Sequence, residues 1–180
     1  RVGQRRLQER ELMVDPRWFP FALDDSDTVI EVRPRRGYCR NETTVFHYDV
    51  VIHDECSADV KDPEIVGNIL GAHKAGIPAV NLHCAMHCYR TGKDDWFEFI
   101  GIQSTGHGPQ KPIDISFIEK EHPITKGLGD WKTVNEELYN NVKLFKTAKS
   151  LARGTQEFPK GNQTTVVVWT NDYHGTRVFN

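Results

Sequence analysis

The sequence predicts an α/β fold in which helices cover both faces of a mostly parallel central sheet. Strand-like and helix-like segments alternate between residues 48 and 89, an order typical of parallel strands joined by helices. Residues 48–54 form an almost continuous apolar run that ends in polar residues, as strands buried on both faces do. A helix with a clear beginning and end separates this run from the next strand-like segment. Together these observations define the fold class.

The helix after the second strand is marked by its first and last residues. Asp62 is a suitable N-cap, Pro63 fits the first helical position and Glu64 adds an acid to the first turn. Gly76 can end the helix. One apolar face is expected, formed by Ile65, Val66, Ile69 and Leu70.

The other elements follow from shorter patterns. We expect strands where β-branched or alternating apolar residues occur, at residues 28–33, 48–54, 77–82, 113–118, 164–169 and 177–179, with a turn at Asn171-Asp172. A further helix is expected to begin within residues 84–89, and the aromatic residues 94–100 are expected to pack on the sheet. Residues 101–112 read as a loop, because three glycines and two prolines surround His107.

Length and composition limit the class of protein. With 180 residues and 38% hydrophobic content, residues 1–180 are expected to form a single domain. The net charge of −2 and the scattered basic residues argue against a nucleic-acid partner. Because no apolar run approaches the roughly 20 residues that span a bilayer, we expect a soluble protein without a membrane partner. The compartment stays open, with the cytoplasm slightly preferred over a periplasmic or secreted location.

The four cysteines give little information on their own. Cys39, Cys56, Cys84 and Cys88 do not fall into paired CxxC spacings, so a zinc ribbon is disfavoured and no disulfide framework can be deduced. Cys84 and Cys88 are read as small buried hydrophobic residues.

A series of motifs across residues 48–180 resembles the ThuA (trehalose utilisation) family. In chain order these motifs are Asn81-Leu82-His83, Gly106-His107-Gly108-Pro109, residues 122–128, Glu137-Leu138-Tyr139 and residues 169–179. The resemblance implies a flavodoxin-like three-layer sandwich similar to the class I glutamine amidotransferases. The family's first strand with its histidine-bearing loop and its closing Gly-His pair are not found, so we expect a ThuA-like domain that lacks its first strand and its C-terminal end. Asn81 stands where the family usually has glycine.

His83 and Glu137 are the expected catalytic residues. His83 lies at a predicted strand-to-helix turn, where the related amidotransferases carry a nucleophilic cysteine, so that glutamine hydrolysis is disfavoured. A histidine there can bind a metal, act as a general base or donate a hydrogen bond. In an extended Glu-x-Tyr segment, Glu137 and Tyr139 point to one side and could position a sugar hydroxyl, and the family motif selects Glu137 over Glu136.

Further ligand-binding positions come from loops at the expected sheet edge. His107, Tyr139, His174 and Asp54 are predicted to bind the ligand. Asp54 and Glu55 could line the same sheet edge or simply cap the following turn. His83, His107 and His174 could hold a divalent metal such as zinc. His87 is expected to point mainly into the packing between helix and sheet.

Three functions remain open. The first is an enzyme of carbohydrate metabolism that acts on a disaccharide or keto-sugar through a His/Glu site, with or without a metal. The second is a non-catalytic sugar- or effector-binding module on an amidotransferase-like scaffold. The third is a cysteine hydrolase or amidotransferase that uses Cys84. The expected partner is a small-molecule carbohydrate, and a homo-oligomer is left open.

Overall fold

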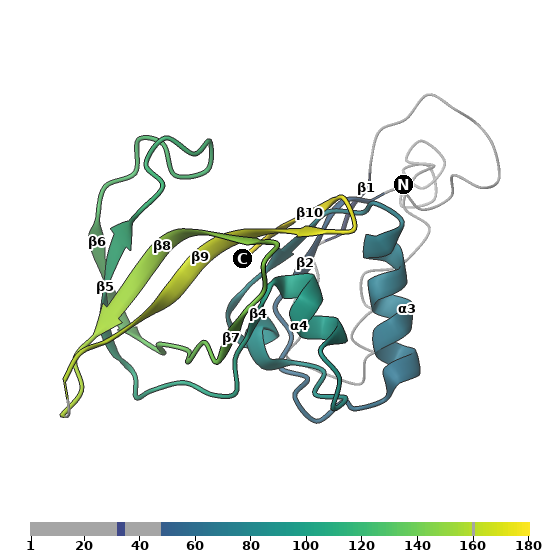
Figure 1. Cartoon of the computed structure of the whole chain (residues 1–180), viewed down its shortest axis with the longest axis horizontal. Helices are drawn as coiled ribbons and strands as arrows, with labels where there is room; N and C mark the ends of the chain where they lie inside the picture. Colours follow the sequence, from purple (N-terminus) through teal and green to yellow (C-terminus); the bar gives the residue numbers. More distant parts are fainter. Residues whose placement is uncertain (1–31, 35–47, 160) are drawn as a thin grey trace, which may run out of the picture.

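The chain folds around one large sheet whose strands are mostly antiparallel. The structure, a computed structural model, describes residues 32–34, 48–159 and 161–180. Its main sheet has eight strands in the order β1-β2-β3-β10-β9-β8-β5-β6, and β4 and β7 form a separate two-stranded sheet (Figure 1). The strands are β1 (Val32–Pro34), β2 (Tyr48–His53), β3 (Ala79–Asn81), β4 (Ile102–Gln103), β5 (Lys111–Phe117), β6 (Trp131–Glu136), β7 (Lys143–Leu144), β8 (Ala148–Gln156), β9 (Gln163–Tyr173) and β10 (Thr176–Phe179).

Parallel pairing is confined to three neighbouring strands, β2, β3 and β10. β3 lies between β2 and β10 and pairs in parallel with both, whereas the other five pairings of this sheet are antiparallel. The prediction of a mostly parallel, flavodoxin-like sheet is therefore wrong, although the mixed α/β class is confirmed. The alternation that predicted parallel strands is real in residues 48–82 but does not continue through the second half of the chain.

A tight turn explains why the last two strands are antiparallel. Tyr173 of β9 pairs with Thr176 of β10, which leaves a two-residue loop of His174 and Gly175. Both have positive φ, 54° and 83°, as a type I′ hairpin turn requires. The turn predicted at Asn171-Asp172 is displaced, because β9 continues through those residues to Tyr173. A two-residue connection cannot return the chain for parallel pairing.

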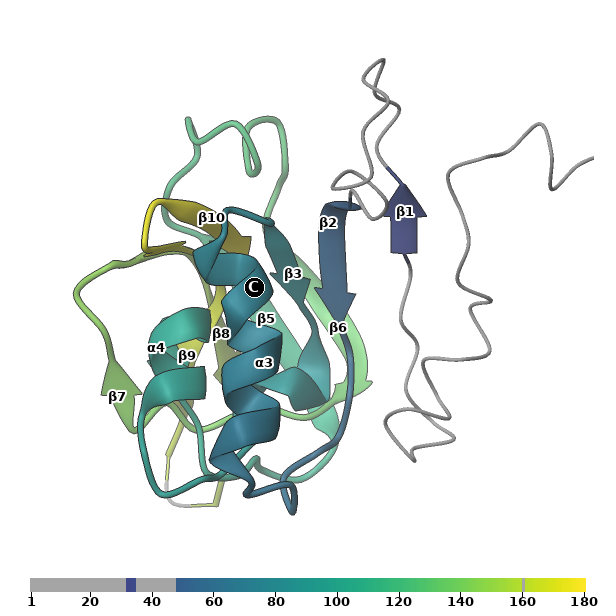
Figure 2. The ribbon, with the colours of Figure 1, turned by 90° about the vertical axis from the view of Figure 1, so that its right-hand side faces the viewer.

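The described helices cover one face of the sheet. Figure 2 shows α3 (Pro63–Lys74) and α4 (Asp95–Ile100) next to each other in front of the strands. Leu70, Trp96 and Trp169 belong to a single hydrophobic cluster between these helices and the sheet. Within residues 32–34, 48–159 and 161–180 no helix covers the second face, so the predicted three-layer sandwich is not confirmed. No helix in this part of the chain is long and apolar enough to cross a membrane.

The sequence predicts α3 well and the next helix poorly. Asp62 Oδ1 accepts a hydrogen bond from the Glu64 N–H at 2.8 Å, and Gly76 follows the helix with φ of 101°. The helix expected within residues 84–89 is only a short 3₁₀ segment, η2 (His83–His87). Strands β6 and β8 were not predicted, and the expected strand at residues 28–33 falls mostly outside the described residues, which include only Val32–Pro34.

A chain of polar side chains is buried between β2 and α3. His53 Nδ1 lies 3.0 Å from Glu55 Oε1, and His53 Nε2 lies 3.0 Å from His73 Nε2. Tyr89 OH also donates to Glu55 Oε1, at 2.9 Å. Glu55 is 3% exposed and His73 only 1%, so the alternative that Glu55 lines the sheet edge is wrong.

Hydrogen-bond geometry assigns the protons in this buried chain. His73 Nδ1 donates to the Ile77 carbonyl at 2.7 Å, so a neutral His73 offers Nε2 only as an acceptor. His53 must then donate from Nε2 to His73, and Nδ1 faces the Glu55 carboxylate. Burial by itself would raise the pKa of Glu55, but the hydrogen bond and charge of His53 outweigh it and hold that pKa below its ordinary value. His53 therefore bridges the Glu55 carboxylate and the neutral imidazole of His73.

Burial of His73 predicts that acid destabilises the fold. Desolvation lowers the pKa of His73 from 6.5 to about 4, so between these pH values the unfolded chain binds a proton that the folded protein does not. The free energy of unfolding should fall by about 3 kcal/mol as the pH drops through this window. The lowered pKa of Glu55 adds a further loss as the pH falls below 4.5. Denaturant unfolding over a pH series measures both effects.

His174→Asn is the matched control for this pH dependence. His174 is exposed and has positive φ, which Asn tolerates, so this variant should keep the slope of stability against pH. His73→Gln should flatten the slope between pH 4 and 6.5. NMR titration of the His73 ring in the unchanged protein measures its pKa independently. A pKa near 6.5 would contradict the lowered value.

Candidate functional site

His83 leaves the sheet directly after β3 in an unusual backbone conformation. Its φ is +42°, in the left-handed region that residues with a side chain rarely adopt. The preceding Leu82 donates its N–H to the His53 carbonyl at 2.8 Å, and Asn81 donates from Nδ2 to Asn180 Oδ1 at 2.7 Å. These contacts hold the end of β3 between its two neighbours. The strained turn presents the His83 ring, 42% exposed, at the sheet edge.

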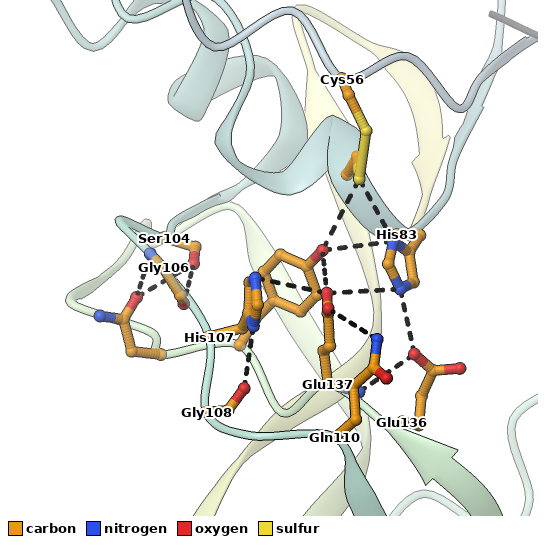
Figure 3. A network of polar contacts seen from close by, with 12 residues as sticks. Cys56, His83, Ser104, Gly106, His107, Gly108, Gln110, Glu136 and Glu137 are labelled. Carbon is orange, nitrogen blue, oxygen red and sulfur yellow. Dashed lines mark hydrogen bonds and ion pairs between the residues drawn. A yellow bond between two sulfur atoms is a disulfide. The ribbon is translucent and has the colours of Figure 1, made fainter. Parts of the chain in front are cut away.

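Glu137 is the centre of the polar cluster. Its Oε2 accepts a hydrogen bond from Tyr139 OH at 3.3 Å and lies 3.4 Å from His107 Nε2 and 3.8 Å from His83 Nε2. Its Oε1 accepts from Gln110 Nε2 at 3.2 Å. Figure 3 shows His83 and His107 on opposite sides of Glu137. One carboxylate therefore lies between two imidazoles from distant parts of the chain.

Backbone contacts position the His107 loop beside the Glu137 segment. His107 and Tyr139 form an isolated antiparallel bridge, and Gly108 N–H donates to the Leu138 carbonyl at 2.9 Å. A side chain at Gly108 would meet Phe158, since an added Cβ would lie 2.6 Å from its Cζ. His107 Nδ1 donates to the Gly108 carbonyl at 2.9 Å, so Nε2 is the nitrogen that faces Glu137.

Hydrogen bonding sets the protonation of the remaining groups. Glu136 Oε1 accepts from the Glu137 N–H and faces His83 Nε2, both at 3.0 Å. The Glu137 N–H, followed by His83, lowers the pKa of Glu136, whereas burial and the neighbouring Glu137 raise the pKa of Tyr139. The site thus presents two carboxyl groups, a phenol that can donate a hydrogen bond and two imidazoles. These groups can hold sugar hydroxyls and transfer protons.

The structure brings together four of the predicted site residues, namely His83, His107, Glu137 and Tyr139. His174 is not among them: it precedes β10, which runs parallel to β3, so it lies at the opposite end of the sheet from His83. Asp54 follows β2 at the same end as His83 but makes no described hydrogen bond or ion pair with the cluster. The proposed trio His83, His107 and His174 is therefore separated.

The described residues contain no group arranged to hold a metal ion. His83 and His107 both approach Glu137 Oε2, but nowhere in residues 32–34, 48–159 and 161–180 are three potential ligands arranged around one ion. Zinc stays a prediction, and no chemical step is assigned to it.

Cys84 differs from its predicted role, whereas Cys88 agrees with it. Cys84 forms a disulfide with Cys56, so it is not a small hydrophobic residue, and its sulfur is not a free thiolate in this oxidised state. Cys88 is buried as predicted, and its Sγ donates to the Glu55 carbonyl at 2.8 Å. Figure 3 shows the disulfide at Cys56 near His83.

Sequence reasoning missed three contributors to the site. Glu136 was set aside in favour of Glu137, although its Oε1 is the carboxylate oxygen that lies 3.0 Å from His83 Nε2. Gln110 gave no signal, because a glutamine in a loop is chemically unremarkable until its partner is known. His87 contributes its ring, with centroids 5.1 Å from Tyr139 and 6.4 Å from His107. Burial, followed by the charge of Arg90, lowers the pKa of His87.

Comparisons with known proteins agree with this fold. The ThuA family model, described as trehalose utilisation, matches residues 30–180. Crystal structures described as ThuA-like proteins from Parabacteroides merdae and Bacteroides uniformis are similar, with TM-scores of 0.60 and 0.59 and 19% identity each. They cover 73% and 74% of this chain, which spans 58% and 60% of their lengths. An alignment over 55 residues is 47% identical to chondramide synthase cmdD from Chondromyces crocatus. It covers 29% of this chain and 1% of that protein.

Loss of the disulfide should destabilise the protein. The bond joins residues 28 positions apart. Closing a loop of this size lowers the entropy of the unfolded chain and so stabilises the fold by roughly 3–4 kcal/mol at 25 °C. The double variant Cys56→Ser/Cys84→Ser should lose about this free energy of unfolding. Unfolding of the unchanged protein with and without a reductant provides the matched comparison. Equal stability with and without the reductant would contradict the stabilising effect assigned to the bond.

Proposed function

The chain belongs to the ThuA, or trehalose utilisation, family, and from this premise we propose that it acts in carbohydrate metabolism on a disaccharide or keto-sugar. The proposed site is the cluster around Glu137, with His83 and Glu137 as the catalytic residues and His107 and Tyr139 as ligand-binding residues. Because the chain spans about 60% of the ThuA-like structures it resembles, the activity of the whole protein is part of this proposal.

One observation carries the proposal: Glu137 lies between two imidazoles and a phenol at an exposed edge. Its Oε2 is 3.4 Å from His107 Nε2 and 3.3 Å from Tyr139 OH, so it is already surrounded by donors. A carboxylate and an imidazole in hydrogen-bond reach of one ligand atom can remove and return a proton. The strained backbone at His83 is also typical of functional positions.

In the proposed reaction, His83 and Glu137 move protons on the sugar while their neighbours orient it. Glu136 Oε1 lies 3.0 Å from His83 Nε2, so it can orient the ring while His83 accepts and returns a proton. Tyr139 keeps its proton, because its pKa is raised, and can donate a hydrogen bond to a sugar oxygen. His107 forms the opposite wall of the site.

A non-catalytic sugar-binding module is the second candidate. The position after β3 carries a histidine, and the adjacent Cys84 is joined to Cys56, so the cysteine nucleophile of an amidotransferase is absent from the oxidised site. The same polar groups that could catalyse proton transfer would bind sugar hydroxyls without turnover. The hydrolase that uses Cys84 is disfavoured for the same reason.

The disulfide also bears on the compartment. Disulfides persist mainly in oxidising environments. The Cys56–Cys84 bond therefore favours a periplasmic or secreted location over the cytoplasm, which the sequence alone slightly favours.

Replacement of the central carboxylate separates the two candidates. Glu137→Gln keeps the shape of the side chain but removes its charge and basicity. It should lower turnover of disaccharides or 3-keto sugars by about 10²- to 10⁴-fold, because general acid–base catalysis contributes about this factor. Product detection measures turnover, and calorimetry measures binding.

The control for this variant is His174→Asn, which lies at the opposite end of the sheet and should leave turnover unchanged. Specific sugar binding without turnover by the unchanged protein would favour the binding module. If the unchanged protein shows no binding and no turnover with either sugar class, the proposal is wrong.

A further inference from the structure

The Cys56–Cys84 disulfide joins an exposed residue to the interior of the polar cluster. Cys56 lies in the segment after β2 and is exposed, whereas Cys84 is half-buried in η2. A thiol from solution therefore reaches the Cys56 sulfur more readily than the Cys84 sulfur. Attack on one sulfur of a disulfide expels the other, so the accessible route makes Cys84 the leaving group.

The Cys84 sulfur has two polar neighbours that could stabilise it after bond cleavage. His83 Nδ1 lies 3.4 Å from Cys84 Sγ, and Tyr139 OH lies 3.9 Å from it. His83 Nε2 faces Glu136 Oε1 at 3.0 Å, so Nδ1 is the ring nitrogen on the side of the sulfur. Nδ1 also lies 3.2 Å from Tyr139 OH, and a ring that carries a proton on each nitrogen can pass its Nδ1 proton to the sulfur.

We propose that Cys56–Cys84 is a thiol-exchange site in which a small thiolate attacks Cys56 and His83 protonates the departing Cys84. The attacking sulfur forms a bond to Cys56 Sγ as the bond between Cys56 and Cys84 breaks. The bonding electron pair leaves with Cys84, which takes the Nδ1 proton, so that His83 becomes neutral. A second thiolate then releases Cys56 as a thiolate, and the two small thiols are oxidised to their disulfide while the protein bond is reduced.

Exchange at this site would alter the proposed carbohydrate site, a consequence that rests on the proposed function. Cys84 directly follows His83, whose φ of +42° requires support from its surroundings. Cleavage removes the covalent link between the segment after β2 and η2 and leaves a thiol against His83 and Tyr139. The orientation of the His83 ring is then no longer fixed by the disulfide.

The position of the first adduct tests the exchange directly. The oxidised protein is treated with limiting glutathione at neutral pH, quenched with an alkylating reagent and analysed by peptide mass spectrometry. We expect glutathione on Cys56 and the alkyl group on Cys84. Glutathione mainly on Cys84, or no adduct on either cysteine, would overturn the proposal. Sugar takes no part in this measurement, so its result tests thiol exchange independently of the proposed function.

Removal of one neighbour of the leaving sulfur tests the role of the cluster. Tyr139→Phe should slow the first exchange step about threefold, because the Tyr139 hydroxyl proton, which points to Glu137 Oε2 before cleavage, can no longer turn to the departing sulfur. Tyr173→Phe is the matched control, since this buried tyrosine lies at the β9–β10 turn, and it should exchange at the unchanged rate. Equal rates in both variants would overturn the stabilising role assigned to the cluster. If oxidised and reduced protein bind sugar equally well, the coupling to the site is wrong.

Discussion

The candidate site depends on the parallel pairing of β3, a strand of only three residues. Ala79–Asn81 is held by β2 on one side and β10 on the other, and the Asn81 side chain adds a contact to Asn180. The backbone hydrogen bond from Leu82 to His53 extends this support to the last residue before the turn. A left-handed conformation is unfavourable for any residue with a side chain. His83 therefore keeps it only because the strand before it is fixed.

The antiparallel half of the sheet brings the second part of the site to the first. β6 ends in Glu136, and the extended residues that follow it pair with the loop that carries His107. Gly108 must be small where this loop meets Phe158, and its N–H joins the loop to Leu138. The charged groups are thus held by backbone contacts of their own segments, and their attraction for one another is not needed to bring them together.

The sequence predicts the local features of this protein better than its long-range ones. Asp62, Pro63 and Gly76 mark α3 because capping is decided within a few residues. The polarity of the sheet is decided by connections such as His174-Gly175, and a histidine with positive φ leaves no clear local signal. The motifs indicated His83, His107, Glu137 and Tyr139 as one site, whereas Glu136, Gln110 and the Cys56–Cys84 bond follow only from the folded arrangement.

Glu55 and Cys56 show how one short segment joins the core to the site. They are consecutive, yet Glu55 is buried against His53 and Tyr89 while Cys56 is exposed and bonded to Cys84. The segment after β2 is therefore attached to η2 by the disulfide, and η2 is attached to β3 through His83. Residues 53–56 thus contact both the buried polar side chains and the candidate site.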